Sequence, residues 1–359
     1  MSAPSRPGRR ALLVGTFDGR EGRLEESYRH ALQAEGFQVF DFDLEARAKA
    51  HDRVVKRLPR GLPPLFRRAL GVLWNDPRAQ FHASRDLVAS AAEIEPELVF
   101  VFNAVPVRAG ALHQVRVLTG AKTVLVWPDP VLNLSDDVTH GLASFDLIAS
   151  YSERACALFH QLGAPRAAFV PLAADPALHP RVEPGSLEPE WDVSFIGNWR
   201  PERTRLIKAV VRGCPDLRVG IFGSNWGEQA GDDADIMRVW SGKPVLGKAF
   251  ADVVHKSRLN LNIHDLVNYP SANMRFFEVP CAGGALLTSP APEMEEAFAG
   301  ALMSFSREDW LGDGTGLVAR VRELLDDEER RLTVARAACQ RVHEEHTYGH
   351  RVRQILSLL

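Results

Sequence analysis

An arginine-rich segment follows a predicted strand end in the second half of the chain. Residues 195–205 read FIGNWRPERTR, so a strand ends at Gly197 and a helix begins a few residues later. Glycine lets the backbone approach a ligand closely, helix N-termini attract anions, and arginine binds phosphate through paired N–H groups. The segment therefore suits a diphosphate, although a strand–helix turn with solvated arginines fits the same pattern.

A second segment, residues 269–288, places Asn273, Arg275 and Glu278 on an otherwise apolar helix. Arg275 and Glu278 are three residues apart and therefore share a helix face. A carboxylate at such a position can accept hydrogen bonds from both hydroxyls of a ribose, and the alternative is an internal ion pair with Arg275. The helix follows a predicted strand at 259–263, which puts it at the edge of the sheet where open α/β folds bind ligands.

Short apolar runs alternate with helical patterns along both halves of the chain, which is typical of parallel sheets covered by helices. We predict an α/β fold with two Rossmann-like domains. A proline-rich stretch without large apolar runs separates them. The predicted boundaries are 1–174 for the first domain, 175–190 for a linker, 191–345 for the second domain and 346–359 for a C-terminal helix.

The composition is that of an ordinary globular protein. The 359 residues carry a formal net charge of −3, which gives no reason to expect a nucleic-acid partner. We see no signal peptide and no apolar stretch near the roughly 20 residues that span a bilayer. The cysteines Cys156, Cys214, Cys281 and Cys339 are far apart and form no close zinc-type pair. We therefore expect free thiols and a cytoplasmic protein.

Several motifs, in order, resemble one family. In the second half they are FIGNWRPER (195–203), GSNWG (223–227), LNLNIH (259–264), NMRFFEVPCAGGALLT (273–288) and HTYGHR (346–351). Looser echoes in the first half are PELVFVFN (96–103), WPDP (127–130), FDLIAS (145–150) and VPLAADP (170–176). The chain resembles the CgeB-like (spore-maturation) glycosyltransferases, a branch of the group-1 glycosyltransferases with the GT-B fold.

The resemblance implies two domains facing each other across a cleft, with the last helix crossing back to the first domain. The second domain would bind a nucleotide-sugar donor, such as a UDP-sugar, and the first domain an acceptor that is a glycan, a protein or a small molecule. Glu278 falls on the second glutamate of the family's paired-glutamate motif, which contacts the donor ribose. Pro270 stands where the first glutamate would be, and Ser271, Asn273 or backbone amides are candidates to replace it.

The predicted donor-binding residues come from the matched motifs of the second half. They are Gly197, Asn198, Arg203, Gly223, Asn225, His264, Ser271, Asn273, Arg275 and Glu278. Arg203 matches the family's arginine after the glycine loop and is the first candidate for the diphosphate.

In the first half, Gly15 and Asn103 end predicted strands and are candidates for residues that line the cleft. Asp18 and Asp129 follow strands and are the candidate catalytic bases, which must come within hydrogen-bond distance of the acceptor hydroxyl. An Asp-Gly turn is the alternative explanation for Asp18.

The resemblance also implies a hexosyltransferase that retains the anomeric configuration and needs no metal and no cofactor. The segment 53–78 mixes basic and apolar residues and is a candidate for weak contact with a membrane surface or an acidic acceptor, although long cations often only cover apolar surface. Two other functions remain open: a GT-B nucleotide-sugar epimerase, and a non-catalytic protein that binds nucleotide sugars or glycans.

Overall fold

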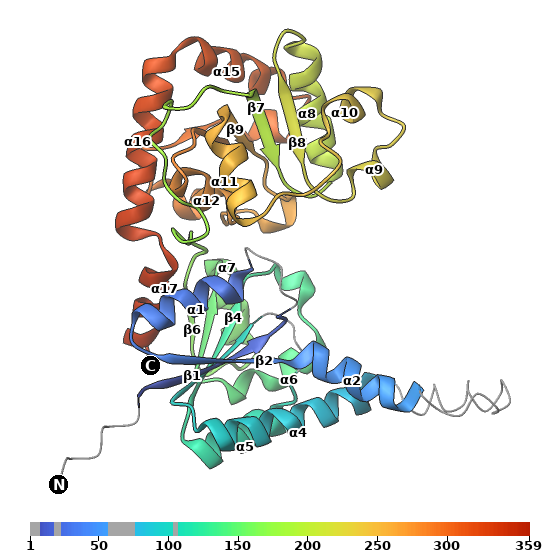
Figure 1. Cartoon of the computed structure of the whole chain (residues 1–359), viewed down its shortest axis with the longest axis vertical. Coiled ribbons are helices and arrows are strands. Elements are labelled where there is room, and N and C mark those ends of the chain that lie inside the picture. Colours follow the sequence, from blue (N-terminus) through green and yellow to red (C-terminus); the bar gives the residue numbers. More distant parts are fainter. Residues whose placement is uncertain (1–7, 18–22, 57–75, 103–106) are drawn as a thin grey trace, which may run out of the picture. The chain divides into compact units, whose positions relative to one another are not determined.

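The computed structural model describes residues 8–17, 23–56, 76–102 and 107–359, and it divides into two compact units (Figure 1). The first unit lies within residues 1–170 and includes 352–359, and the second comprises residues 171–351. Each unit contains one sheet whose paired strands are all parallel. The predicted fold class, α/β with two parallel-sheet domains, is confirmed.

The sheet of the first unit has the strand order β2-β1-β3-β4-β5-β6. Its strands are β1 (Arg10–Gly15), β2 (Gln38–Asp43), β3 (Leu98–Phe102), β4 (Lys122–Trp127), β5 (Leu147–Ser150) and β6 (Ala167–Phe169). Every residue of β3 is buried, as the continuous apolar run predicts for a strand that is covered on both faces.

Helices cover the first sheet, and Figure 1 shows α1 and α4 on opposite sides of β1. The helices are α1 (Leu24–Ala34), α2 (Leu44–Lys56), α4 (Asp76–Ile94), α5 (Ala109–Thr119), α6 (Asp136–Gly141) and α7 (Glu153–Gln161), with 3₁₀ turns at Val131–Asn133 and Leu142–Ser144. Large side chains such as Trp127 and Phe159 meet edge to face in the core of this unit.

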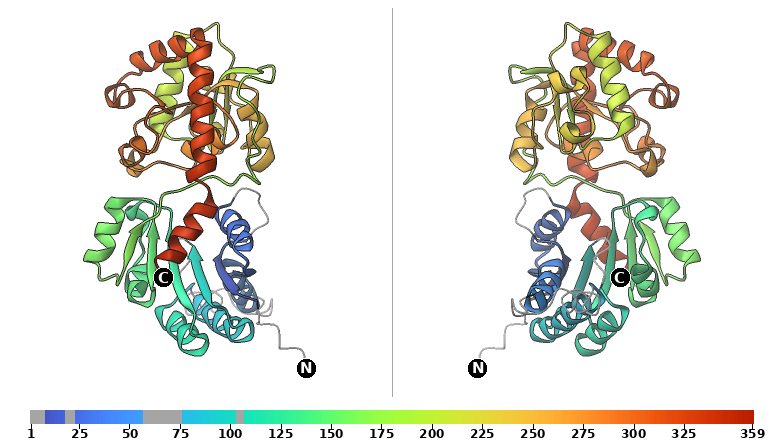
Figure 2. Two further views of the ribbon diagram at one scale, coloured as in Figure 1. Left: turned by 90° about the vertical axis from the view of Figure 1, so that its left-hand side faces the viewer. Right: turned by 90° about the vertical axis from the view of Figure 1, so that its right-hand side faces the viewer.

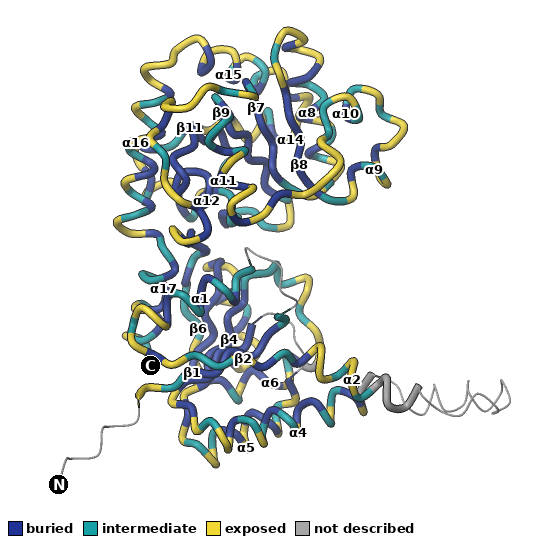
Figure 3. Tube along the Cα trace, in the orientation of Figure 1, coloured by how far each residue is buried: buried dark blue, intermediate teal, exposed yellow. Residues whose placement is uncertain are grey.

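The sheet of the second unit has the order β11-β10-β9-β7-β8. Its strands are β7 (Trp191–Ile196), β8 (Val219–Phe222), β9 (Ser257–Asn262), β10 (Leu286–Thr288) and β11 (Met303–Ser304). In Figure 3 the strands of this unit are mostly buried and its outer turns are exposed. A separate core surrounds this sheet, with Trp226 and Trp310 fully buried.

Nine helices of the described chain surround this second sheet, and a tenth, α17, starts in the same unit. The nine are α8 (Pro201–Gly213), α9 (Trp226–Gln229), α10 (Ala234–Val239), α11 (Gly247–His255), α12 (Arg275–Cys281), α13 (Pro292–Glu295), α14 (Arg307–Leu311), α15 (Thr315–Asp326) and α16 (Glu328–Glu345). Helix α8 contacts α10, α14 and α15, whereas α12 contacts α16. Figure 2 shows α16 as a long helix on the outside of this unit.

Helix α17 (Tyr348–Ser357) begins in the second unit and ends in the first. Near its start, the Arg351 guanidinium donates hydrogen bonds to the carbonyls of Pro171 (2.8 Å) and Leu172 (3.2 Å). Near its end, the Gln354 amide donates to the carbonyl of Phe169 (2.9 Å). Residues 175–190, which we predicted as a linker, belong to the second unit.

Candidate functional site

The strand order of the second sheet creates a switch point, which is a place where the connections after two neighbouring strands run in opposite directions. The chain leaves β7 toward β8 on one side, and then returns to β9 on the other side of β7. The loops that follow β7 and β9 therefore diverge at the carboxyl edge of the sheet, which is where open α/β sheets bind ligands. Most of the predicted donor-binding residues lie in these loops or in the loop after β8.

The loops after β7 and β8 are held together by close backbone packing. A side-chain carbon on Gly223 would lie 1.9 Å from the carbonyl oxygen of Gly197, so only glycine fits there. The Trp226 indole donates to the same carbonyl (2.9 Å), and the Asn198 side chain accepts a hydrogen bond from the Ser224 backbone N–H (3.2 Å). Asn225 follows in the left-handed conformation, with a φ of 67°.

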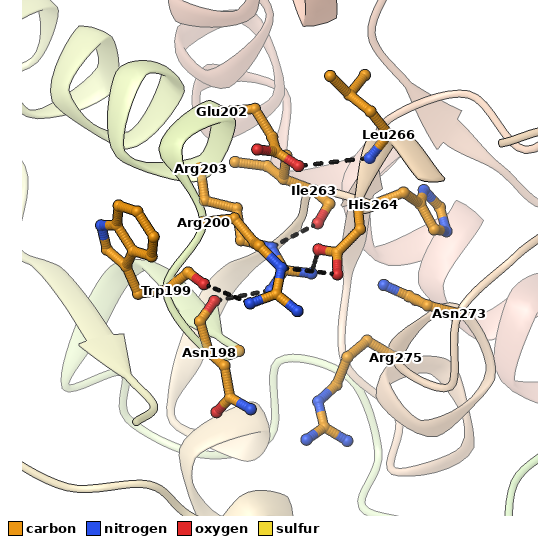
Figure 4. Close-up of polar contacts among 12 residues, drawn as sticks. Asn198, Trp199, Arg200, Glu202, Arg203, Ile263, His264, Leu266, Asn273 and Arg275 are labelled. Atoms are coloured by element: carbon orange, nitrogen blue, oxygen red, sulfur yellow. Dashed lines mark hydrogen bonds and ion pairs between the residues drawn. The ribbon is translucent and has the colours of Figure 1, made fainter. Parts of the chain in front are cut away.

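Arg203 ties the loop after β7 to the loop after β9. From α8, its guanidinium donates to the carbonyls of Asn198 (2.7 Å) and Ile263 (3.0 Å) and pairs with Asp265 (2.6 Å). Figure 4 shows the Arg203 side chain directed toward both carbonyls. Because the residue is only 8% exposed, these contacts make it a brace for the site. Contact between Arg203 and a diphosphate stays a prediction.

Arg200 shares Asp265 with Arg203 but is far more accessible. Its Nε lies 3.1 Å from the Asp265 carboxylate and its Nη1 donates to the Trp199 carbonyl (3.0 Å), yet 47% of the side chain is exposed. In the described part of the chain no partner is found for its Nη2. Arg200 can therefore offer N–H groups to a ligand without leaving Asp265.

The loop before α12 is fixed by a reciprocal pair of amides. The Asn262 side chain, at the end of β9, donates to the Asn273 side chain (3.0 Å) and accepts from it (2.9 Å). The Asn273 oxygen also accepts the backbone N–H of Phe276 (3.2 Å) and so supports the start of α12. Ser271, in the same loop, is buried, and no partner for its hydroxyl is found among the described residues.

His264 is a buried, neutral ring. Burial, together with the nearby positive charge of Arg203, lowers the pKa of His264 to about 3. The Ser289 hydroxyl oxygen accepts the His264 backbone N–H (2.9 Å) and forms a second hydrogen bond with Nδ1 of the ring (2.8 Å). The other ring nitrogen, Nε2, is buried, and no partner for it is found among the described residues. The pair links the loops after β9 and β10.

Arg275 and Glu278 form an ion pair at the start of α12. Arg275 also donates from Nε to the Ile196 carbonyl (3.3 Å) and lies over the ring of Phe250, and 24% of its side chain is exposed. Glu278 is 2% exposed and lies 3.8 Å from Nε2 of His179. Burial lowers the pKa of His179, although the Glu278 charge acts in the opposite direction. The ion pair between Arg275 and Glu278 is one of the two roles that the sequence allowed for Glu278. The other role, contact with the donor ribose, stays a prediction.

Three arginines and three carboxylates therefore meet at this edge. Besides the pairs already described, Glu202 accepts the backbone N–H of Leu266 (3.3 Å). The charges balance, so an anion would be bound through directed N–H groups, mainly those of Arg200 and Arg275, and not through net positive charge. The sequence patterns did not single out Asp265, Ser289 or His179, and they indicated Arg200 only as one of the arginines in the segment 195–205.

Two of the residues predicted in the first unit, Gly15 and Asp129, lie at the carboxyl edge of its own sheet. Gly15 ends β1, next to the side chain of Glu25. Asp129 is half-buried in the loop after β4. The other two candidates, Asp18 and Asn103, lie outside the described residues, as does most of the segment 53–78.

Within the described ranges, no three His, Cys, Asp or Glu side chains gather in a way that could hold a metal ion. None of the described helices is both long and apolar enough to cross a membrane.

Residues 200–357 match a protein-family model described as glycosyl transferase-like. No curated protein matches the chain in sequence. Among solved structures, the chain is similar to a sucrose-phosphate synthase from Thermosynechococcus elongatus, with 12% identity, a TM-score of 0.64 and 98% of each chain covered. It is also similar to a glycosyltransferase from Rickettsia africae, with 9% identity, a TM-score of 0.62, and 98% of this chain and 97% of that chain covered.

HepE from Anabaena, solved in complex with UDP and glucose, is similar at 15% identity with a TM-score of 0.62, covering 97% of this chain and 99% of that chain. At these identities the structures show the fold alone. The fold is that of the GT-B glycosyltransferases, as the sequence resemblance implied, and the second half of the chain is glycosyl transferase-like in sequence. Membership of the CgeB-like branch stays a prediction.

Proposed function

We propose that this chain is a CgeB-like glycosyltransferase that moves a hexosyl group from a nucleoside-diphosphate sugar to a hydroxyl of a glycan, protein or small molecule. The family match over residues 200–357 supports the transferase activity. The HepE structures, which contain UDP, support a nucleotide-sugar donor. We place the reaction in the cytoplasm.

The observation that carries the proposal is the braced edge of the second sheet. Arg203 holds the loops after β7 and β9 in place through three protein acceptors. That arrangement leaves Arg200 and Arg275, at 47% and 24% side-chain exposure, to contact the ligand. Such preorganised donors suit the diphosphate of a donor substrate.

In the reaction, the bond between the anomeric carbon and the oxygen of the β-phosphate breaks, and its electron pair leaves with the nucleoside diphosphate. Negative charge develops on that leaving group, and fixed guanidinium groups stabilise it without reorganising. The acceptor oxygen bonds to the anomeric carbon, and its proton passes to a base, for which Asp18 and Asp129 are our candidates. We propose that the configuration is retained, which requires the acceptor oxygen to approach the anomeric carbon from the face that the nucleoside diphosphate leaves.

The directed N–H groups of Arg200 and Arg275 would take the part that a divalent cation takes in other transferases, so we propose that no metal is needed. Glu278 would accept hydrogen bonds from the donor ribose. With Pro270 in place of the first glutamate of the family motif, Ser271 and Asn273 are proposed to contact the sugar.

The experiment is to incubate the protein with UDP-glucose and a panel of other nucleotide sugars, with and without EDTA, and to measure free nucleoside diphosphate. A transferase releases it slowly even without acceptor, by transfer to water, and EDTA leaves the rate unchanged. An interconverted sugar nucleotide would identify an epimerase. An unchanged donor that still binds would identify a non-catalytic binding protein, and either result would overturn the proposal.

A further inference from the structure

A cavity of about 570 Å³ lies in the first unit, between α4, α5 and α6. Helix α5 is the first helix after β3, so its N-terminus lies at the carboxyl edge of the first sheet. The cavity is thus built by residues of the first unit alone and has no part in the donor site. Its volume is in the range of pockets that bind small organic molecules.

The charged groups that line the described part of the cavity are both positive. They are Arg85 from α4 and Arg108 at the start of α5, with the His140 ring from α6 beside them, and the described lining residues include no Asp or Glu. Arg85 and Arg108 are both exposed. These side chains place guanidinium N–H groups where a phosphate or carboxylate could accept them.

The N-terminus of α5 adds to the positive electrostatic potential of the cavity. The helix has 11 residues, and Arg108 precedes it without a capping hydrogen bond from its side chain. The first N–H groups of a helix have no intrahelical acceptor, and the helix dipole makes this end positive. Gly110, in the first turn, lines the cavity and adds no side chain that would cover the backbone.

A buried hydroxyl points to a missing acceptor or donor. Ser84 lines the cavity and is 2% exposed, and no hydrogen-bond partner of its Oγ is found among the described residues. A buried polar group without a partner is costly, so native structures usually provide one. A ligand oxygen in the cavity would satisfy it.

One side of the cavity is apolar. The Phe81 ring is 45% exposed, and the Arg108 guanidinium carbon lies 5.6 Å from its centroid. An exposed aromatic ring beside cations favours a ligand that joins an anionic group to a flat or apolar part. A lone phosphate ion would leave this surface uncovered.

We propose that this cavity is a second ligand site, which binds a small organic phosphate or carboxylate through Arg85, Arg108, Ser84 and the N-terminus of α5. The apolar part of the ligand lies against Phe81. The proposal concerns the first unit alone and does not depend on the proposed glycosyl transfer.

Titration calorimetry of the full chain with phenyl phosphate, benzoate and the neutral phenyl glucoside tests it. We expect at least one of the two anions to bind, and which of them binds more tightly identifies the anionic group. Arg85→Ala should weaken binding about tenfold or more, because a charge-assisted contact is lost. Ser84→Ala should weaken it about threefold while the melting temperature stays at or above that of the wild type.

Lys122→Ala is the matched control, because it removes an exposed cation at the amino edge of the same sheet, and it should bind the anions as the wild type does. Equal binding of the wild type and Arg85→Ala would overturn the proposal, as would the failure of both anions to bind more tightly than phenyl glucoside. UDP is titrated in the same series. If phenyl phosphate binds but UDP does not, the proposed function fails and the second site stands.

Discussion

The two sheets have the same kind of switch point, but different charged side chains start the helix that follows the central strand. In the second unit, α8 follows β7 and carries Arg203, which is buried against the neighbouring loops. In the first unit, α1 follows β1 and begins with Glu25 and Glu26, and the Glu25 carboxylate accepts the backbone N–H of Thr16 (3.4 Å). A carboxylate near a helix N-terminus interacts favourably with the positive end of the helix dipole, so the start of α1 has little attraction for an anion.

The comparison teaches that one topology can serve two ligand chemistries. At the second switch point, arginine N–H groups suit a diphosphate. At the first, the acidic helix start suits hydroxyl groups or a proton acceptor, which agrees with the proposed division between donor and acceptor. Anion binding in the first unit is instead proposed at α5, one crossover further along the chain.

The largest effect is expected for Arg203→Ala. It leaves Asp265 partly buried with only the exposed Arg200 and leaves the carbonyls of Asn198 and Ile263 without a donor. Breaking a buried ion pair costs about 3–5 kcal/mol. We expect the free energy of unfolding of the second unit to fall by about that amount and UDP binding to be lost, as measured by urea unfolding and calorimetry.

Arg212→Ala on the same helix is the control, because that side chain is 65% exposed and pairs only with Asp235 among the described residues. It should change the stability by less than about 1 kcal/mol. If Arg203→Ala lowers the free energy of unfolding no more than Arg212→Ala does, Arg203 does not brace the site. The comparison between Arg203 in the second unit and Glu25 in the first would then be wrong.

The next prediction distinguishes a residue that binds the ligand from one that stabilises the loops. Arg200→Ala removes an exposed guanidinium, so the fold should keep its stability while UDP binding weakens by about 1.5–3 kcal/mol through the loss of a charge-assisted contact. Uridine binding should not change, since uridine has no phosphate. Calorimetry with both ligands checks this, and an equal loss for uridine and UDP would place Arg200 away from the diphosphate.

Acid should destabilise the second unit before the first. His346 is buried, and burial together with the Arg351 charge lowers its pKa to about 3. None of the histidines described in the first unit is buried. Since unfolding returns His346 to a pKa near 6.5, the unfolded state binds more protons below that pH, and stability falls as the pH falls. The loss between pH 7 and pH 5 is about 2 kcal/mol for one such histidine.

His346→Asn tests this assignment, because the asparagine oxygen can accept the hydrogen bond that Arg351 donates to Nδ1 (2.8 Å). Urea unfolding at pH 7, 6 and 5 should show a flatter pH dependence in the variant. A slope equal to that of the wild type would mean that His346 is not the group that titrates on unfolding.

Local patterns in the sequence predicted both parallel sheets and placed Arg275 and Glu278 on one helix, because burial on both faces requires continuous apolar strands and side chains three apart share a helix face. The prediction that Asn273 lies on the same helix was wrong, because α12 begins at Arg275 and Asn273 lies in the loop before it. The bracing role of Arg203 could not be predicted. Its acceptors include the carbonyl of Ile263, 60 residues away, and a backbone carbonyl has no signature in the sequence.

His179 was missed for a related reason. It lies in the stretch 175–190, where prolines hide any periodic pattern, and only the folded chain brings it to 3.8 Å from Glu278. Asp265 follows the strand predicted at 259–263 and Ser289 ends one predicted at 285–289, and a position at a strand end was the available signal for both. The same signal is common to every loop at the edge of a sheet, so it does not select among them.

The smallest and most discriminating effect is expected for Glu278→Gln. The change keeps the shape of a side chain that is 2% exposed but removes its charge. If Glu278 accepts hydrogen bonds from the ribose, uridine and UDP should both bind more weakly, by about 1 kcal/mol, because a neutral amide oxygen is a weaker acceptor. Calorimetry with the two ligands measures this, with a thermal melt to show that the variant is folded.

The alternative role of Glu278 predicts the opposite sign. If it serves only as the partner of Arg275, the glutamine leaves that guanidinium with an uncompensated positive charge. UDP binding would then stay unchanged or become tighter, while uridine binding would not change, since uridine carries no charge for Arg275 to attract. That outcome would mean that a residue other than Glu278 contacts the ribose. The residues of the second switch point would then bind only the diphosphate.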